Sequence, residues 1–458
     1  MALWAFNDSY PEGVSAKVTA HVVKELHYVA ATSTNPVWPY TSWATAATNI
    51  QDAVDVASVP GATVFVTNGI YSAGGQIDPN GNFDVVVADE SLIIQSINGP
   101  SVTLIDGGGA ATCVYLTNKT LLVGFTLTNG FACHGNYGGV GCESTTAVLS
   151  NCVLTGNSIS GAYGGTLNRC MVSGNSGDGA DYCTLNNCTL TGNSGYGAAD
   201  STLNNCAVIG NSGGAQFCTL NNCTLSSNSG GGAYDCTLNN CIVYFNSDAN
   251  GADYDPSSTL NYCCTTLMPA NGVGNITNDP LFVDYAGGNL YLQSNSPCIN
   301  SGNNAYVVGS TDLDGNPRIV GGTVDIGAYE YQTPVSLISY AWLQQYDLPT
   351  DGSVDHVDLD GTGFNVYQDW VAGLNPTNSL SVLKMLEPSA TNTPLGLVVT
   401  WQSVSNIIYF LQRSTNLGAQ PAFTTIQSNI VGQAGTTSCM DTNAVGSGPF
   451  FYRLGVGN

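Results

Sequence analysis

The segment TLNNCTLTGNSG, residues 184–195, belongs to a repeat that organises most of the chain. Aligned on cysteine, the units end at Cys152, Cys170, Cys188, Cys206, Cys223, Cys241 and Cys263, at intervals of 18, 18, 18, 17, 18 and 22 residues. The asparagine of the corner recurs in step at Asn157, Asn175, Asn193, Asn211, Asn228 and Asn246. A short fixed period with apolar pieces and turn residues indicates a solenoid.

Each unit has the length of one turn of a parallel β-helix and is too short for a pair of helices. Stacked coils are spaced by about 4.8 Å, so every repeat position becomes a column. One inward column is predicted at Leu167, Leu185, Leu203, Leu220, Leu238 and Leu260, and another at Leu190, Val208, Leu225 and Val243.

The repeat cysteines form a third column, and Cys183, Cys218 and Cys236 belong to a fourth. Buried free cysteine behaves as a small apolar residue, so we interpret these thiols as core packing. Neighbouring coils lie within disulfide range, but each ladder cysteine has competing neighbours, which argues against a unique set of bridges. The spacing matches no zinc motif.

Charged residues make up only 9% of the 458 residues, and the formal net charge is −24. Nucleic acid and anionic membranes require a basic face, so we expect neither as a partner, and a polyanionic polysaccharide is disfavoured too. There is no run of 18 apolar residues, and no transmembrane helix is predicted.

Residues 1–26 match no repeat and are interpreted as a strand or a tether. A first strand is predicted at residues 27–30 and another at 63–66, with a helix between them that begins at Thr48 as N-cap. One face of this helix carries Ile50, Ala53, Val54 and Ala57. It would cap the open end of the β-helix, which otherwise exposes unpaired strand edges.

Three further segments resemble a known family: TSWATAATNIQDAVDVA (41–57), VTNGIY (66–71) and QSINGPSVTLIDG (95–107). With the TLNNCTLTGNS unit, they are similar to secreted right-handed parallel β-helix proteins, relatives of pectate-lyase-like and polymorphic outer-membrane-protein repeats. The resemblance covers residues 27–332 and implies an extracellular or cell-surface protein. The expected fold is all-β: a right-handed parallel β-helix solenoid with an N-terminal capping helix, followed by a small C-terminal β-sandwich.

Two polar clusters within this region have structural interpretations. His134 has Cys133, Cys142 and Glu143 as sequence neighbours. Their spacing fits no metal-ligand pattern, so we favour a polar loop over a metal site. Arg318 stands among Asp312, Asp314, Asp325 and Glu330. We interpret it as a partly buried ion pair rather than a catalytic group.

Residues 333–379 are predicted to hold a linker helix and an EF-hand-like calcium loop. The predicted ligands are Asp358, Asp360, Thr362, the carbonyl of Phe364, and Asp369, with Gly363 at the sharp bend. The loop resembles a dockerin-like calcium loop, but Thr362 and the short Asp369 depart from that pattern and should weaken binding. An ordered metal-free turn is the alternative.

Residues 380–458 alternate apolar and polar residues between turns, which predicts a small β-sandwich similar to fibronectin-type or immunoglobulin-like modules. The core candidates are Trp401, Tyr409, Leu411, Phe450 and Tyr452. The predicted domains are therefore 1–26, 27–332, 333–379 and 380–458.

Many parallel β-helices act on polysaccharides, but a fold alone does not assign a function. Lys119 and Arg169 are the only Lys or Arg residues between Lys24 and Arg318, and neither has the carboxylate neighbours that a lyase base needs. A hydrolase would need paired carboxylates. Four acids at the corner before the TLNNC strand are interpreted as isolated, solvated turn residues: Asp178, Asp181, Asp200 and Asp235.

Rows of threonine and asparagine flank the inward leucines and are predicted to point outward. They include Thr184, Asn186, Thr202, Asn204, Thr219, Asn221, Thr237 and Asn239. Such rows solvate a stacked sheet, or they bind a glycan, a surface or a second copy of the protein. We expect a non-catalytic extracellular structural or adhesive protein, self-assembling or glycan-binding, that requires no cofactor. The alternative is a polysaccharide lyase or glycoside hydrolase.

Overall fold

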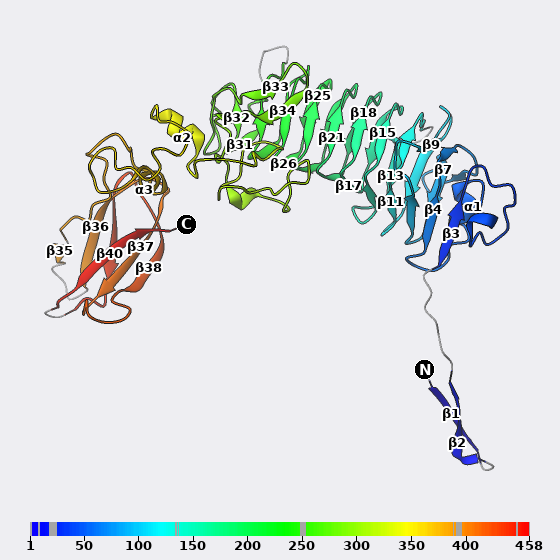
Figure 1. Ribbon diagram of the computed structural model, residues 1–458, viewed down its shortest axis with the longest axis horizontal. Coiled ribbons are helices and arrows are strands. Elements are labelled where there is room, and N and C mark those ends of the chain that lie inside the picture. The colour runs from blue at the N-terminus through cyan, green and yellow to red at the C-terminus, as the bar shows by residue number, and fades with distance from the viewer. Residues whose placement is uncertain are drawn as a thin grey trace. The chain divides into compact units, whose positions relative to one another are not determined.

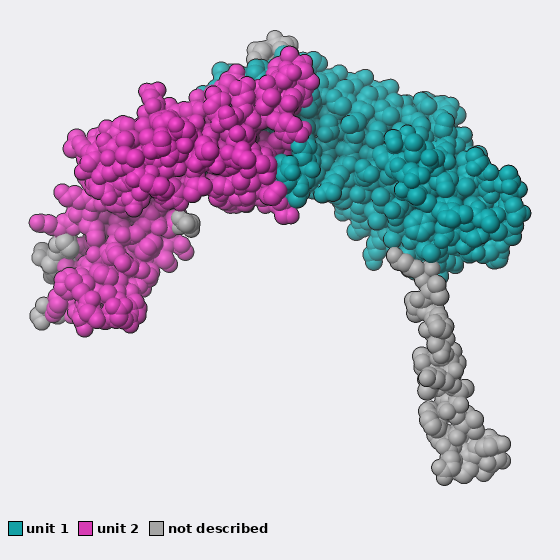
Figure 2. Space-filling view, viewed as in Figure 1, with its two compact units in different colours: residues 1–277, 311–316 teal, residues 278–310, 317–458 magenta. Residues whose placement is uncertain are grey.

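The structure is a computed structural model that describes residues 2–7, 10–17, 25–132, 135, 137–247, 253–387, 389–390, 396–445 and 448–457, the backbone alone for 2–17 and 389–390. The chain divides into two compact units, residues 1–277 with 311–316, and residues 278–310 with 317–458 (Figure 2). In the predicted N-terminal segment, β1 (Ala2–Asn7) and β2 (Tyr10–Lys17) form an antiparallel pair.

The strands of the first unit form three long sheets in which neighbouring coils pair in parallel (Figure 1). Sheet I comprises β3 (Leu26–Val29), β4 (Thr63–Val66), β8 (Ile93–Ser96), β11 (Leu121–Val123), β14 (Val148–Ser150), β17 (Thr166–Asn168), β20 (Thr184–Asn186), β23 (Thr202–Asn204), β26 (Thr219–Asn221), β29 (Thr237–Asn239) and β31 (Thr259–Asn261). Sheet II comprises β5 (Gly69–Tyr71), β9 (Thr103–Asp106), β12 (Thr126–Thr128), β15 (Val153–Thr155), β18 (Met171–Ser173), β21 (Thr189–Thr191), β24 (Ala207–Ile209), β27 (Thr224–Ser226), β30 (Ile242–Val243) and β32 (Cys264–Thr265).

Sheet III comprises β7 (Phe83–Ala88), β10 (Thr112–Leu116), β13 (Tyr137–Cys142), β16 (Ser160–Tyr163), β19 (Ala180–Asp181), β22 (Tyr196–Ala199), β25 (Gly213–Gln216) and β28 (Ala233–Tyr234), with β6 (Gln76–Ile77) antiparallel at its edge. One coil therefore contributes one strand to each sheet. The prediction of an all-β parallel β-helix is confirmed.

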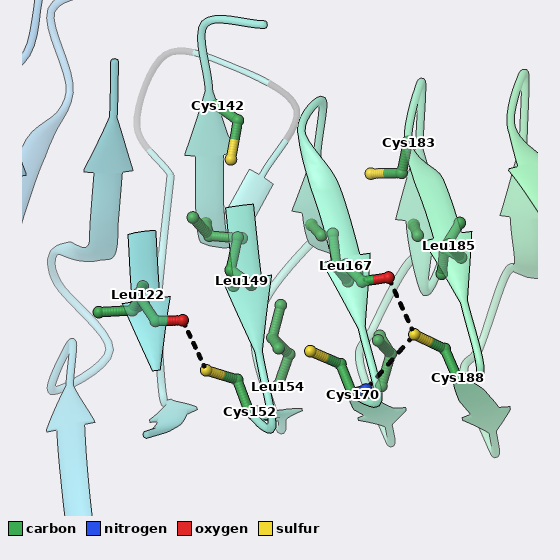
Figure 3. Close-up of a cluster of buried hydrophobic side chains, with 14 of the residues drawn as sticks. Leu122, Cys142, Leu149, Cys152, Leu154, Leu167, Cys170, Cys183, Leu185 and Cys188 are labelled. Carbon is green, nitrogen blue, oxygen red and sulfur yellow. Dashed lines mark hydrogen bonds between the residues drawn. The ribbon is translucent and has the colours of Figure 1, made fainter. Parts of the chain in front are cut away.

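The predicted columns exist because the repeat units pair in register. Leu185 pairs with Leu167 on one side and with Leu203 on the other. All ten leucines and valines of the two predicted apolar columns are fully buried. The cysteines form parallel columns inside the coils (Figure 3). Every cysteine in the described part of the chain is free, and the column cysteines lie within the buried apolar core, where core packing predicts them.

The second asparagine of TLNNC has a conformational role at the corner between sheets I and II. Asn187, Asn205, Asn222 and Asn240 have φ between 52° and 54°, in the left-handed region. Asparagine tolerates this conformation better than most residues, because its short side chain bonds the local backbone. The corner therefore favours asparagine immediately before the repeat cysteine, although Arg169 and Tyr262 take this position before Cys170 and Cys263.

The capping helix is α1 (Ile50–Val54), preceded by the 3-10 turn η1 (Trp43–Thr45). Its N-cap is Asn49, whose side chain accepts the N–H of Asp52 at 2.8 Å. The predicted N-cap Thr48 was thus wrong by one residue. Asn49 occupies the position from which its carboxamide reaches the free N–H groups of the first turn. The predicted apolar face is buried, as expected.

The second unit begins with a hairpin of β33 (Phe282–Asp284) and β34 (Asn289–Leu292), followed by η2 (Asn304–Tyr306). The predicted ion pair is present here: Nη2 of Arg318 lies 3.2 Å from Oε2 of Glu330, and both side chains are buried. Next come α2 (Tyr340–Gln345) and α3 (Val366–Ala372). Ile338 and Leu343 form a core with Val366, against which Trp342 packs.

The chain ends in two three-stranded antiparallel sheets. One comprises β35 (Ser389–Ala390), β36 (Leu397–Ser403) and β39 (Gly435–Asp441), and the other β37 (Ile408–Ser414), β38 (Thr424–Val431) and β40 (Phe451–Val456). Trp401 and Tyr409, one from each sheet, are fully buried with ring centroids 5.8 Å apart. Leu411 is buried as predicted, but Phe450 and Tyr452 are only half-buried. Tyr452 uses its hydroxyl to bond Asp441 instead. The predicted domain boundaries stay predictions.

Candidate functional site on the outer face of sheet III

An aromatic row follows sheet III and its corner with sheet I. It consists of Tyr115, Tyr137, Tyr163, Tyr182, Phe217 and Tyr234. The ring centroids of Tyr137 and Tyr163 are 6.1 Å apart, and those of Tyr163 and Tyr182 are 5.4 Å apart. Further along, Phe217 and Tyr234 make a second contact at 5.9 Å. The rings of Tyr115 and Tyr137 are buried, whereas Tyr182, Phe217 and Tyr234 are 45–56% exposed.

A pocket of about 370 Å³ opens where the row is most buried. Its lining includes Tyr115, Tyr137, Tyr163, Asn80 and Glu143. The ring of Tyr137 lies flat over Gly141, where a Cβ would come within 2.1 Å of its Cζ. Glycine at position 141 thus makes room for this wall of the pocket.

A hydrogen bond to Asp78 fixes the position of the Tyr137 ring. The Tyr137 hydroxyl donates to Oδ2 of Asp78 at 2.6 Å, and the backbone N–H groups of Asn80 and Asn82 donate to the same carboxylate. Burial alone would raise the pKa of Asp78, but these hydrogen bonds outweigh it and lower that pKa below its ordinary value. Asp78 is therefore an ionised anchor for the aromatic wall.

Tyr182 and Phe217 occupy strained positions. Their φ angles are 54° and 52°, in the left-handed region where bulky side chains are unfavourable. On the corner between sheets I and II, asparagine fills most of the equivalent positions. Residues in such conformations cost about 1–3 kcal/mol each and gather at functional sites. Both rings are exposed, so the fold gains little apolar burial in return.

Asp178 and Asp181 stand among the rings, which corrects our interpretation of these two acids as isolated, solvated turn residues, whereas Asp200 and Asp235 are exposed. Oδ2 of Asp181 accepts the hydroxyl of Ser160 at 2.5 Å, and Asp178 accepts the N–H of Tyr196 at 2.5 Å. Burial, followed by Asp178 and Asp200, raises the pKa of Asp181 to about 6. Asp178 and Asp181 lie three residues apart in one coil, and the coil stacking adds Asp200 from the next coil.

Asp84 is a second buried acid of sheet III, with neither carboxylate oxygen bonded to any group the structure describes. It pairs in register with Thr112 on the next coil. Burial, followed by repulsion from Asp78, raises the pKa of Asp84 to about 8. Asp84 is therefore protonated at neutral pH.

The predicted threonine and asparagine rows lie in register on sheet I. The asparagines bond to one another along the stack: Asn204 donates to Asn186 at 2.9 Å, and Asn221 donates to Asn204 at 3.0 Å. Much of their hydrogen-bonding capacity is thus used within the protein. A ligand-binding role for these rows stays a prediction.

The predicted calcium loop brings three carboxylates near one another but does not arrange them in a coordination geometry for a metal ion. Asp358 accepts the N–H groups of Gly361 and Gly363 at 2.8 and 2.9 Å. Asp369 is buried with both oxygens unbonded, and burial, Asp360 and Asp358 raise its pKa to about 6. A cation would fit this uncompensated charge. However, no cluster of three or more ligating side chains set for a metal occurs among the described residues, so calcium binding stays a prediction.

Cys133 and His134 of the other polar cluster lie outside the described residues. Sequence reasoning missed the aromatic row because its members do not recur at one interval. One signal was available: Tyr182 and Phe217 each stand immediately before a cysteine of the second cysteine series. None of the described helices is long and apolar enough to cross a membrane.

No family model and no curated protein matches the chain. Similar solved structures include the A-module of the Azotobacter vinelandii mannuronan C-5 epimerase AlgE6, with 15% identity, TM-score 0.33, and coverage of 49% of this chain and 88% of that chain. Another is the enzymatically active domain of tailspike protein 2 from bacteriophage CBA120, with 12% identity, TM-score 0.30, and coverage of 92% and 73%. A third is the GH136 lacto-N-biosidase from Eubacterium ramulus, with 9% identity, TM-score 0.30, and coverage of 56% and 67%. Likeness this remote is no basis for assigning a function.

Proposed function

We propose that the protein is an extracellular glycan-binding β-helix protein with an adhesive role, and that the aromatic row and its pocket form the binding face. One observation carries the proposal: Tyr182 and Phe217 hold exposed rings in a backbone conformation that disfavours them. Flat apolar rings with polar edges suit the faces and hydroxyls of pyranose units. Asn80 and Glu143 in the pocket supply hydrogen-bond donors and acceptors for the sugar hydroxyls.

A double variant, Tyr182→Asn with Phe217→Asn, tests this proposal sharply. Asparagine suits the left-handed backbone, so the fold should be retained or slightly stabilised while both rings are lost. A glycan array with the full chain should identify a binding oligosaccharide, and the double variant should bind it at least about tenfold more weakly.

The matched control is Thr202→Val with Thr219→Val on sheet I, which keeps β-branched side chains but removes the hydroxyls of the predicted rows. We expect unchanged binding. An array without any hit, or full affinity in the asparagine variant, would refute the proposal. Loss of binding in the valine variant alone would show that the glycan binds to sheet I instead of the aromatic row.

A carbohydrate-active enzyme is the second candidate, favoured by the coupled carboxyl groups of Asp178 and Asp181 beside the rings. A carboxylic acid whose pKa is raised by burial and by a neighbouring carboxyl group is suited to acid–base chemistry on a glycosidic bond. If it is correct, the bound oligosaccharide releases new reducing or unsaturated ends, and Asp181→Asn abolishes this release without abolishing binding. A binding protein leaves the oligosaccharide intact.

A further inference from the structure

The charge of the aromatic row restricts the kind of glycan it can hold. Asp178, Asp181 and Asp200 stand within or beside the row, and Asp235 lies two coils beyond Asp200. None of the ion pairs among the described residues involves any of the four. Arg169, the only Arg or Lys between Lys119 and Arg318, precedes Cys170 at the opposite end of a sheet I strand. There its guanidinium lies near Gly315.

Repulsion within this group is visible in two places. The negative charges of Asp178 and Asp200 both act on Asp181. Asp200 also acts on the exposed hydroxyl of Tyr182, whose pKa is raised with Asp200 as the largest cause. An added positive charge would relieve this repulsion, whereas an added carboxylate would increase it.

We infer that the aromatic row binds a glycan that carries protonated amino groups, in which the sugar faces stack on Tyr163 and Tyr182 and the ammonium groups pair with Asp178, Asp181 and Asp200. This inference rests on the proposed function and narrows it to one ligand class. An ammonium group beside Tyr182 can form charge-assisted hydrogen bonds with the carboxylates and a cation–π contact with the negative face of the ring. Polyuronates, by contrast, are repelled.

The inference is tested by titrating the full chain with three hexasaccharides in a slightly acidic buffer of low salt. They are de-N-acetylated chitohexaose, the N-acetylated hexamer, and hexagalacturonate. The de-N-acetylated hexamer should bind at least about tenfold more tightly than the N-acetylated one, which corresponds to about 1.4 kcal/mol. Added salt should reduce this preference. Hexagalacturonate should show no binding.

Asp200→Asn and Asp178→Asn should each reduce the preference for the de-N-acetylated hexamer several-fold, by weakening its binding more than that of the N-acetylated hexamer. Glu387→Gln, at an exposed position of the second unit, removes the same charge elsewhere and should change neither. Hexalysine carries comparable positive charge without sugar rings. It should bind more weakly than the amino hexamer and lose less affinity than that hexamer on Tyr182→Asn, because only the cation–π contact is lost and no sugar stacking.

Equal affinity for the two chitohexaoses, or a preference that Asp200→Asn and Asp178→Asn leave intact, would overturn the inference while glycan binding stands. Tighter binding of hexalysine would show a site for cationic chains rather than sugars. If none of the hexamers binds, the inference fails, and the glycan array decides the proposed function separately.

Discussion

Asn193 donates its side-chain amide to the side-chain oxygen of Asn211, one coil further along, at 2.8 Å. The same oxygen accepts the backbone N–H of Asn193 at 3.0 Å, and the Asn193 amide also donates to the carbonyl of Val172 at 3.2 Å. Equivalent bonds run from Asn157 to Asn246 in the buried interior. This ladder satisfies polar groups that the corner would otherwise bury without partners.

Asn193→Ala should lower the free energy of unfolding by about 2–5 kcal/mol, because it removes from the buried interior the two bonds that Asn175 donates to Asn193 and the bond that Asn193 donates to the carbonyl of Val172. The control is Asn186→Ala in the half-buried outer ladder, where water can replace the lost bonds at about 1 kcal/mol or less. Urea unfolding measures both variants. Equal losses would show that burial of the inner ladder is unimportant.

Cys206→Ser should be tolerated at a cost below about 1.5 kcal/mol, whereas Cys206→Leu should cost about 1–3 kcal/mol through overpacking. Serine already takes the place of a thiol in the second cysteine series, where the hydroxyl of Ser201 accepts the N–H of Cys183 at 3.0 Å. Thermal unfolding compares the two variants. A larger loss for serine than for leucine would contradict a purely packing role.

The native thiols should be nearly inert towards a disulfide reagent. Of the cysteines that the structure describes, only Cys439 is not fully buried. Burial also raises the pKa of several of these thiols, for example those of Cys113 and Cys142 to about 12. Rapid titration of several thiols in the folded protein, compared with the urea-unfolded control, would contradict the buried columns.

Asp84→Asn should stabilise the protein increasingly as pH rises. The folded-state pKa of about 8 exceeds the unfolded value near 4. Between these values the unfolded chain releases a proton that the folded chain retains, so wild-type stability falls with pH through this window. The variant should gain up to about 4 kcal/mol between pH 4 and pH 7. The control is Asp89→Asn, at an exposed acid just beyond β7, which should show no such trend. If the difference in unfolding free energy between Asp84→Asn and the wild type does not change with pH, Asp84 is not the group that retains the proton.

Calcium should raise the midpoint of thermal unfolding of the second unit with a dissociation constant of about 10⁻⁴–10⁻³ M, because the loop has few charges and a short last ligand. Protons compete for Asp369, so affinity should fall as pH drops below about 6. Asp369→Asn should abolish the effect and Glu387→Gln should retain it. A midpoint that EDTA and calcium leave unchanged would favour the metal-free turn.

The repeat allowed the sheets and columns to be predicted in detail, since Leu185, Leu203 and Cys206 occupy fixed positions of one period. The capping helix and the Arg318 ion pair were also accessible, because each follows from a local pattern. The inner asparagine ladder was visible as a recurrence at Asn193 and Asn211, but its burial was not. An asparagine at a corner is equally compatible with a solvated side chain and with a buried one until the direction of the side chain is known.

By itself the sequence determined that this protein is a β-helix, because side chains one period apart must share an environment when coils stack. Only the tertiary structure showed that the aromatic residues gather in one row. Tyr163 and Tyr182 stand nineteen residues apart and at different positions of the repeat, yet their rings meet at 5.4 Å. The direction in which each corner turns brings them together, and no period in the sequence encodes that direction.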